Sequence, residues 1–194
     1  ARFEALDLAN FSSVDAFVRA VSAADRPPIA GVVLNAGIIA LDGWGVTEAD
    51  GMERVLQINH LAHQHLVVSL LEAAAESVAA ASPPMRVVSV SSWIPARNAA
   101  RGPAETGGVV HWESPETYPF ELEPIVHGAY GATKQHTIRF SRELARRYPQ
   151  RVRSFSLHPG LISTALGVRR GSGVVSALSR YGAAGFWWGA GHFV

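Results

Sequence analysis

Three helical patterns alternate with three short apolar runs along this chain, and this alternation constrains its fold more than any other feature. The helical patterns cover residues 11–26, 48–80 and 128–148, and the apolar runs cover residues 29–37, 86–92 and 151–160. Strands that are linked through helices form parallel sheets with right-handed crossovers. The order therefore predicts the α/β class, with a doubly wound parallel sheet and helices on both of its faces.

The first helical pattern and the apolar runs carry clear local signals. Ser12 and Asp15 have the spacing of a capping box, and Pro27 ends the pattern. Its apolar residues have helical spacing: Val14, Phe17, Val18 and Val21. The run 29–37 is continuously apolar, which predicts a strand that is buried on both faces. The run 86–92 predicts a second buried strand, and the run 151–160 a third strand that ends in a Pro-Gly turn.

Composition narrows the class of protein. The 194 residues, of which 48% are hydrophobic, suit one domain with a sizeable core. A net charge of +1 offers no basic field for nucleic acid. The absence of cysteine excludes disulfide scaffolds and thiolate zinc sites and fits a cytoplasmic protein. No run of about 18 uncharged apolar residues is present, so we predict no transmembrane segment.

Residues 93–126 interrupt the alternation, because they are rich in proline and glycine. We predict that they form a lid-like insertion within a single domain that spans residues 1–194. In parallel sheets, ligands bind beyond the carboxyl ends of the strands. The three predicted ends should converge on one crevice: Asn35-Ala36-Gly37, Ser91-Ser92 and His158-Pro159-Gly160.

Tyr130 and Lys134 stand four residues apart in the third helical pattern, hence on one helix face. Tyrosine is a poor base at its usual pKa near 10, but a neighbouring ammonium favours the phenolate and lowers this pKa. Such a pair can pass a proton to or from an alcohol near neutral pH. Taken alone the spacing is weak evidence, because it also occurs on helices that face solvent.

Two further residues strengthen this interpretation. Ser92 ends a predicted strand, where its hydroxyl can donate a hydrogen bond to a substrate oxygen. Asn59 lies in an otherwise apolar helix, where an unpaired buried amide costs about 1–3 kcal/mol. The chain up to Thr164 resembles the short-chain dehydrogenase/reductase family, because these motifs occur in the family's order: Asp7-Leu8, Asn35-Ala36-Gly37, Asn59, Ser91-Ser92, Tyr130-x-x-x-Lys134 and Pro159-Gly160-x-Ile162-x-Thr164. The stretches QINHLAHQHL and RELARR are similar to its retinol-dehydrogenase-like branch.

The resemblance implies a Rossmann-like fold and a role for each matching residue. Tyr130 is expected to be the general acid/base, and Lys134 to lower its pKa and hold the nicotinamide ribose. Ser92 is expected to polarise the carbonyl, and Asn59 to anchor a proton-relay water. The implied cofactor is NADP or NAD, with a slight preference for NADP. Besides Tyr130 and Lys134, it is expected to contact Asp7, Leu8, Asn35, Ala36, Gly37, Pro159, Gly160, Ile162 and Thr164.

The resemblance also implies a truncated domain. A pyrophosphate loop joins the first strand of such a fold to its first helix, and no glycine-rich loop precedes Asp7. LGVRRGSG, residues 166–173, has a similar glycine spacing, but it follows the third predicted strand. We interpret this spacing as a coincidence. We therefore expect the cofactor loop to lie upstream of Ala1, and the fold to be shortened after Thr164 as well.

The expected activity is the NADP- or NAD-dependent interconversion of a ketone or aldehyde and an alcohol. For the aromatic end GFWWGAGHFV, three interpretations stay open: it lines a lipophilic substrate pocket, it binds a partner, or it is a poorly packed terminus. The helices of Asn59 and Tyr130 are expected to form a homodimer face. The alternative function is an inactive remnant that serves as a binding or dimerisation scaffold. His60, His63 and His65 lie close together, but without a nearby carboxylate or cysteine we expect no metal site.

Overall fold

The computed structural model of the chain describes residues 2–23, 25–40, 43–76, 83–94 and 129–160. Helices and strands alternate along these residues, as the sequence predicted. The elements are α1 (Phe11–Val21), β1 (Gly31–Leu34), α2 (Arg54–Leu56), the π-helical segment η1 (Gln57–Leu61), α3 (Ala62–Glu76), β2 (Met85–Val90), α6 (Gly131–Arg147) and β3 (Val152–Leu157).

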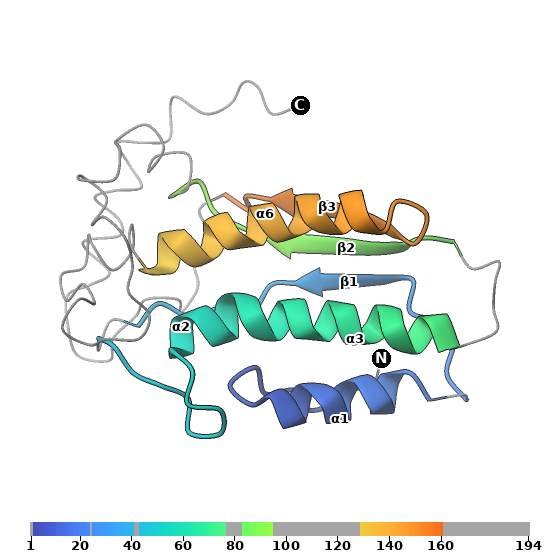
Figure 1. Cartoon of the computed structure of the whole chain (residues 1–194), viewed down its shortest axis with the longest axis horizontal. Coiled ribbons are helices and arrows are strands. Elements are labelled where there is room, and N and C mark those ends of the chain that lie inside the picture. Colours follow the sequence, from blue (N-terminus) through green and yellow to red (C-terminus); the bar gives the residue numbers. More distant parts are fainter. Residues whose placement is uncertain (1, 24, 41–42, 77–82, 95–128, 161–194) are drawn as a thin grey trace.

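The three strands form one parallel sheet in the order β1-β2-β3 (Figure 1). Leu34 of β1 lies opposite Ser89 of β2, and Val90 of β2 lies opposite Leu157 of β3. One residue beyond β2, the Ser91 N–H donates to the Leu157 carbonyl at 2.8 Å. The carboxyl ends of the strands therefore lie side by side, which confirms the predicted α/β class and the predicted convergence of the strand ends at one edge.

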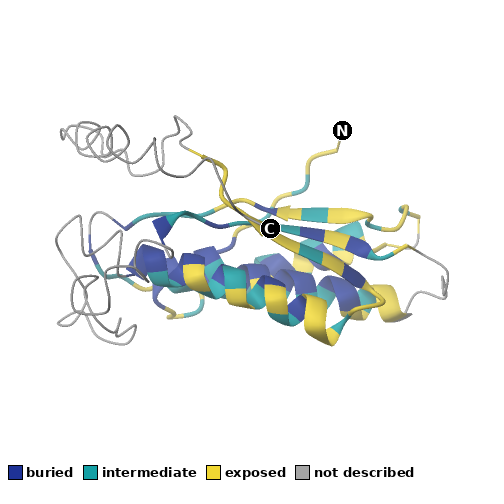
Figure 2. Ribbon diagram, turned by 90° about the horizontal axis from the view of Figure 1, so that it is seen from above, coloured by how far each residue is buried: buried dark blue, intermediate teal, exposed yellow. Residues whose placement is uncertain are grey.

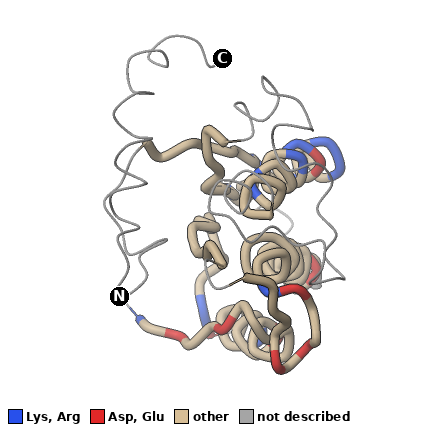
Figure 3. Tube along the Cα trace, turned by 90° about the vertical axis from the view of Figure 1, so that its left-hand side faces the viewer, with Lys and Arg blue, Asp and Glu red and all other residues tan. Residues whose placement is uncertain are grey.

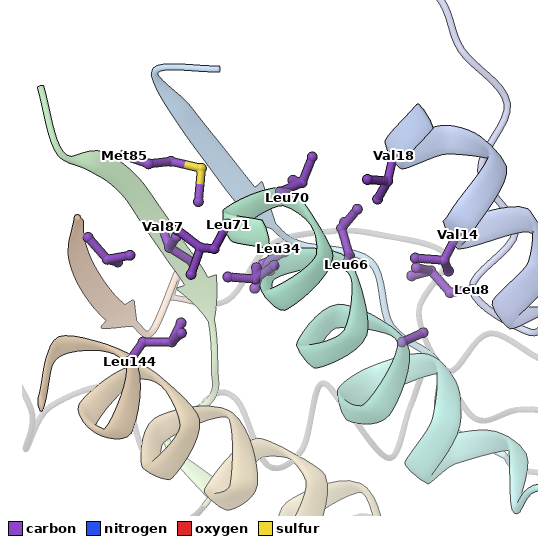
Figure 4. Packing of buried hydrophobic residues seen from close by; sticks show 13 residues of the cluster. Leu8, Val14, Val18, Leu34, Leu66, Leu70, Leu71, Met85, Val87 and Leu144 are labelled. Atoms are coloured by element: carbon purple, nitrogen blue, oxygen red, sulfur yellow. The ribbon is translucent and has the colours of Figure 1, made fainter. Parts of the chain in front are cut away.

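The hydrophobic core lies between the sheet and a single layer of helices, α1, α3 and α6 (Figures 1 and 2). Apolar side chains of α1 pack against α3, and the other side of α3 faces the inward-facing residues of β1 and β2 (Figure 4). The fully or nearly fully buried members of this cluster are Val14, Val18, Leu34, Leu66, Val67, Leu70, Leu71, Val87, Leu144 and Val152. Burial of a side chain of this size contributes about 1.5–3 kcal/mol, so this layer supplies much of the stability.

The opposite face of the sheet is not covered by any described element (Figure 2). Val33 is 67% exposed and Phe155 is 53% exposed. The prediction that residues 29–37 form a strand buried on both faces is therefore wrong for β1, and the described helices lie on one face of the sheet only.

The boundaries of two helices differ from the prediction. Asn10 rather than Ser12 caps α1, because the Asn10 side chain accepts hydrogen bonds from the backbone N–H groups of Ser12 and Ser13. The helix predicted from residue 48 begins only at Arg54, because Gly51 has a φ of 66° and the preceding residues form a loop. In place of one regular helix, the chain forms α2, η1 and α3 in succession.

The side of α6 that packs against the sheet is built from small hydroxyl residues. Thr133, Thr137 and Ser141 are buried. Thr137 donates to the Thr133 carbonyl at 3.0 Å, and the Ser141 and Ser154 hydroxyls are 2.9 Å apart. Small side chains allow α6 to lie close to the sheet, and the hydrogen bonds satisfy their buried hydroxyls. The N-terminal residues of α6 are therefore held over the end of β2.

Charged residues are unevenly distributed over the described elements (Figure 3). Arginines gather along α6, whereas acidic residues gather near α1 and in the loop that precedes α2. Among the described helices, none is both long and apolar enough to cross a membrane. The glycine-spaced stretch 166–173, the aromatic end and nearly all of the predicted insertion 93–126 lie outside the described residues.

Candidate active site

Asn59 of η1 joins three parts of the fold at the carboxyl edge of the sheet. Its side chain is 1% exposed. Its Oδ1 accepts from the Ile38 N–H at 2.8 Å, and its Nδ2 donates to the Ile38 carbonyl at 2.9 Å. Nδ2 also donates to Thr133 Oγ1 at 3.2 Å. The partners expected for a buried amide are therefore present, and they connect the segment after β1 to η1 and α6.

Thr133 extends this connection to the first residues of α6. It is fully buried, and its hydroxyl donates to the Tyr130 carbonyl at 2.7 Å while accepting from Asn59. The backbone that carries Tyr130 is thus fixed relative to Asn59. Neither Ile38 nor Thr133 was expected from the sequence. Ile38 contributes only backbone atoms, and a threonine inside a helix gives no signal of its own.

Lys134 is buried at 5% exposure on the first turn of α6. Its Nζ donates to the Val90 carbonyl at 2.8 Å and lies 5.4 Å from the centre of the Tyr130 ring. Among the described residues, no carboxylate pairs with this ammonium group. Burial lowers the pKa of Lys134 to about 8. The ammonium therefore remains largely protonated at neutral pH, with N–H donors left for a ligand.

Tyr130 does not show the lowered pKa that the sequence led us to expect. Burial raises its pKa to about 12, because the phenolate loses more hydration than the nearby charge returns. The geometry explains this result: the Lys134 ammonium binds the Val90 carbonyl and lies beside the Tyr130 ring. In the unliganded chain Tyr130 is therefore a phenol, and a proton donor, at neutral pH.

Gly37 lies in contact range of two of these groups. A Cβ at this position would lie 3.1 Å from Asn59 Oδ1 and 3.7 Å from Lys134 Nζ. The Asn35-Ala36-Gly37 stretch therefore meets Asn59 and Lys134, as predicted from the convergence of the strand ends. Asn35 and Ala36 are exposed, so their surfaces are open to a ligand.

The serine pair at the end of β2 is divided between two environments. Ser91 is buried and donates to the Lys134 carbonyl at 2.9 Å, which fastens the end of β2 to α6. Ser92, the expected catalytic serine, is half-buried, and its hydroxyl accepts from the Ile94 N–H at 3.3 Å. A direct contact between Ser92 and Tyr130 remains a prediction.

The other residues predicted to contact the cofactor lie in different environments. Pro159 and Gly160 are exposed beyond β3, and Gly160 has a φ of 82°. Asp7 is exposed and its carboxylate accepts from the Ala9 N–H at 2.9 Å in the turn before α1. Leu8 packs in the hydrophobic core. Ile162 and Thr164 lie outside the described residues.

Histidines form a second polar group between η1, α3 and α6. The His60 and His136 rings stack with centroids 5.2 Å apart. Burial, reinforced by the charge of Lys134, lowers the pKa of His63 to about 4. Burial, with smaller contributions from His136 and His63, likewise lowers the pKa of His60 to about 4. These rings are therefore neutral at neutral pH, and the described residues contain no group of three side chains suited to a metal ion.

A buried tyrosine and lysine one helical turn apart, at the carboxyl edge of a parallel sheet, define a Rossmann-like protein with a candidate proton-transfer site. Known proteins agree with this class. The chain is 32% identical over 160 residues to a WW domain-containing oxidoreductase of Drosophila melanogaster, covering 82% of this chain and 35% of that protein. It is 32% identical over 162 residues to human retinol dehydrogenase 11, covering 83% of this chain and 44% of that protein.

A solved structure supports the fold. The 3-oxoacyl-[acyl-carrier protein] reductase from Brucella melitensis, in complex with NAD, aligns with a TM-score of 0.57 at 22% identity. The alignment covers 94% of this chain and 60% of the reductase. No family model matches the chain. From these relatives, the chain belongs to the short-chain dehydrogenase/reductase family, and it spans less than half the length of the two curated relatives above.

Proposed function

We propose that the protein containing this chain is an NAD(P)-dependent oxidoreductase that interconverts a ketone or aldehyde and an alcohol. The observation that carries the proposal is the buried group at the start of α6. Tyr130 and Lys134 lie one turn apart, and Asn59 fastens that turn to the segment after β1 through Thr133 and Ile38. Membership of the family supports the same activity.

Each residue has a proposed task in this reaction. Tyr130, a phenol at neutral pH, donates its proton to the substrate oxygen as the carbonyl is reduced. Ser92 donates a hydrogen bond to the same oxygen and polarises the carbonyl. Asn59 keeps the proposed task of anchoring a proton-relay water, and because its side chain already binds Ile38 and Thr133, this task falls to acceptor capacity that those bonds do not use. In the oxidative direction, the Lys134 ammonium stabilises the phenolate that then accepts the proton.

The residues present fit a nicotinamide cofactor. Lys134 keeps one N–H on the Val90 carbonyl, which leaves its other donors for ribose hydroxyls. Gly37 has no side chain, so Asn59 and Lys134 can lie close to its backbone, where a Cβ would come within 3.1 Å of Asn59 Oδ1. Asn35, Ala36, Pro159 and Gly160 border the same edge. The bound cofactor, NADP or NAD, supplies or accepts the hydride.

We further propose that the pyrophosphate loop precedes Ala1 in the natural protein. The chain covers only 35% of the Drosophila relative and 44% of human retinol dehydrogenase 11, which supports this proposal. A helix N-terminus in that loop would provide the backbone donors for the pyrophosphate. Without it, the nicotinamide is not held within about 3–3.5 Å of the substrate carbon.

The proposed function predicts a specific pattern of activity. The full-length protein, including its natural sequence before Ala1, should oxidise NADPH or NADH with members of a panel of ketones and aldehydes. Tyr130→Phe should lower kcat by about 10²–10⁴-fold, because it removes the transferred proton. Tyr148→Phe is the matched control, since Tyr148 ends α6 on the side of the core. Residues 1–194 alone should show no turnover.

Two outcomes would contradict these proposals separately. Turnover of the full-length protein that survives Tyr130→Phe would remove Tyr130 as the proton donor. Turnover by residues 1–194 alone, lost in Tyr130→Phe, would show that no upstream loop is needed. A folded full-length protein without any turnover would favour the alternative, a binding or dimerisation scaffold.

The proposed substrate is lipophilic.

The proposed assembly is a homodimer through the helices that carry Asn59 and Tyr130. Where these two helices meet, the His60 ring contacts both His136 and Phe140. This half-buried ring cluster supports a contact surface there. Sedimentation of the full-length protein tests it: His136→Glu should shift a dimer toward monomer, and an unchanged mass would contradict this face.

A further inference from the structure

Gln57 is a fully buried polar side chain for which the proposed mechanism has no use. It is the largest of the fully buried side chains among the described residues. Its Oε1 accepts from Thr47 Oγ1 at 2.6 Å, and its Nε2 donates to Asp50 Oδ2 at 2.5 Å. A carboxamide that is buried with both ends paired fixes its own orientation, because each rotation leaves a buried polar atom unsatisfied.

The partners of Gln57 are themselves anchored. Asp50 Oδ2 also accepts from the Phe11 N–H at 3.0 Å, at the first residue of α1. Thr47 Oγ1 accepts from the Met52 N–H at 3.3 Å, and the Thr47 N–H donates to the Met52 carbonyl at 2.9 Å. Thr47, Asp50 and Gln57, which we call the clamp, therefore tie η1 to the loop before α2 and to α1.

Asn59 extends from the opposite side of the same segment. Two residues along a helix point in nearly opposite directions, so Gln57 faces the clamp while Asn59 faces Ile38 and Thr133. Both side chains are buried, at 0% and 1% exposure. The rotation of η1 about its axis is therefore fixed from two sides, one by the clamp and one at the candidate active site.

Because η1 is π-helical, the direction in which Asn59 points depends on how this segment is rotated. The Ala62 N–H donates to the Gln57 carbonyl five residues earlier, so the segment contains one residue more than an α-helical turn. Such an extra residue can move along a helix, and the residues that it passes then rotate. If η1 relaxed in this way, Asn59 would turn away from Ile38 and Thr133.

We propose that Gln57 is a positioning residue: through the clamp it holds the extra residue of η1 in place and so aims Asn59 at Ile38 and Thr133. It acts through Asn59 and touches no reacting atom. The effect of Gln57 on the orientation of the Asn59 side chain can be measured without any enzymatic activity. The effect of Gln57 on turnover rests on the proposed function, so the two effects are measured independently.

The test exchanges the two polar groups of the clamp. In Q57E, a second carboxylate faces Asp50, and two carboxylates at this distance cannot both stay ionised. In D50N/Q57E, the amide and the carboxylate have changed places. The amide introduced at position 50 can donate to the carboxylate introduced at position 57, and that carboxylate can also accept from Thr47. The bonds that hold η1 are thus restored, whereas the Phe11 N–H, which shares Asp50 Oδ2 with Gln57 in the native chain, loses its acceptor. The matched control is S141A, which loses a partly buried hydrogen bond to Ser154 of β3, eight residues further along α6 than Thr133.

Hydrogen exchange of the Ile38 amide, measured by NMR in the full chain, reports the orientation of Asn59, because this amide donates to Asn59 Oδ1. The Ser91 amide, which donates to Leu157, is the internal reference. We expect Q57E to accelerate Ile38 exchange about tenfold or more relative to Ser91, and D50N/Q57E to stay within about twofold of wild type. S141A should leave the ratio unchanged. In the full-length enzyme, kcat should fall and recover in the same order, with KM for the cofactor nearly constant.

The proposal fails if Q57E leaves the exchange ratio unchanged, if D50N/Q57E does not restore it, or if S141A raises it equally. If Q57E does not fold, the double variant decides: a folded double variant with wild-type exchange supports the clamp, and an unfolded one overturns it. Absence of turnover in the wild type would count against the proposed function only, because the exchange result stands without it.

Discussion

At the scale of single residues, Thr133 decides how firmly Asn59 is held. Its hydroxyl stands between the Asn59 amide and the Tyr130 carbonyl, in a fully buried position. Thr133→Val keeps the shape but leaves an Nδ2 hydrogen of Asn59 without a partner. We expect a loss of about 1–3 kcal/mol in the free energy of unfolding, measured by urea denaturation. Thr133→Ser keeps the hydroxyl and should lose less; an equal loss in both variants would assign the effect to packing.

Gly37 offers a second test at this scale. A methyl group there would lie 3.1 Å from Asn59 Oδ1, closer than ordinary packing allows. Gly37→Ala should therefore cost about 1–3 kcal/mol and shift the NMR signal of the Ile38 amide. Gly45→Ala is the control, because the atoms nearest to its Cβ would belong to the flexible Arg54 side chain, at 3.4 Å or more. Equal effects of the two substitutions would contradict a specific contact with Asn59.

These residues also show what the sequence could and could not predict about the site. The nearness of Gly37, Asn59 and Lys134 follows from strand ends that meet at one edge, so it could be predicted. The partners of Asn59 could not, because Ile38 contributes backbone atoms. The direction of the Tyr130 pKa was predicted wrongly, because spacing along a helix does not show that Lys134 binds the Val90 carbonyl.

At the scale of elements, the contact of η1 and α3 with α6 depends on neutral histidines. Burial holds the pKa values of His60 and His63 near 4, below their ordinary 6.5. The Lys134 ammonium beside His63, and the rings of His63 and His136 beside His60, disfavour protonation as well. Since the folded pKa values are lowered, the unfolded chain binds protons first as the pH falls. Stability is therefore complete above about pH 6.5 and is lost as the pH falls toward 4.

This predicts a steep acid limb, that is, a steep fall in the free energy of unfolding of the chain as the pH becomes acidic. Each of the two histidines should remove up to about 1.4 kcal/mol per pH unit between pH 6.5 and 4, measured by denaturant unfolding across this range. The double variant His60→Gln/His63→Gln should flatten the limb. His65→Gln is the control, since His65 contacts Asp15 near the surface. A limb that is unchanged in the double variant, or flattened equally by the control, would contradict this origin.

The elements differ in how well the sequence predicts them. The order of helices and strands, and the parallel sheet, follow from periodicity and are confirmed. The π-helical turn could not be predicted, because tertiary contacts of Gln57 and Asn59 stabilise it and the surrounding apolar pattern looks like one regular helix. The late start at Arg54 was also missed, because the residues before it contain no proline to mark a break.

At the scale of the whole molecule, the described chain has one packed face and one bare face. Helices cover one side of the sheet, while Val33, Phe155 and Leu157 are exposed on strands of the same sheet. β1 and β3 are its edge strands in the described residues. Apolar surface beside unpaired strand edges promotes association with other chains. The packing that orders the site is thus accompanied by a surface that favours self-association of residues 1–194.

We therefore expect residues 1–194, expressed alone, to self-associate as their concentration rises, measured by sedimentation velocity. The double variant Phe155→Thr/Leu157→Thr should reduce this association, because it removes apolar surface from strand positions that are 53% and 42% exposed while keeping a residue suited to strands. It should leave the free energy of unfolding within about 1 kcal/mol, because surface substitutions cost little. Val46→Thr is the matched control, since Val46 is 46% exposed but lies in the loop before α2. If the control reduces association as much as the double variant, or if the double variant changes nothing, then the bare face is not the surface through which these chains associate.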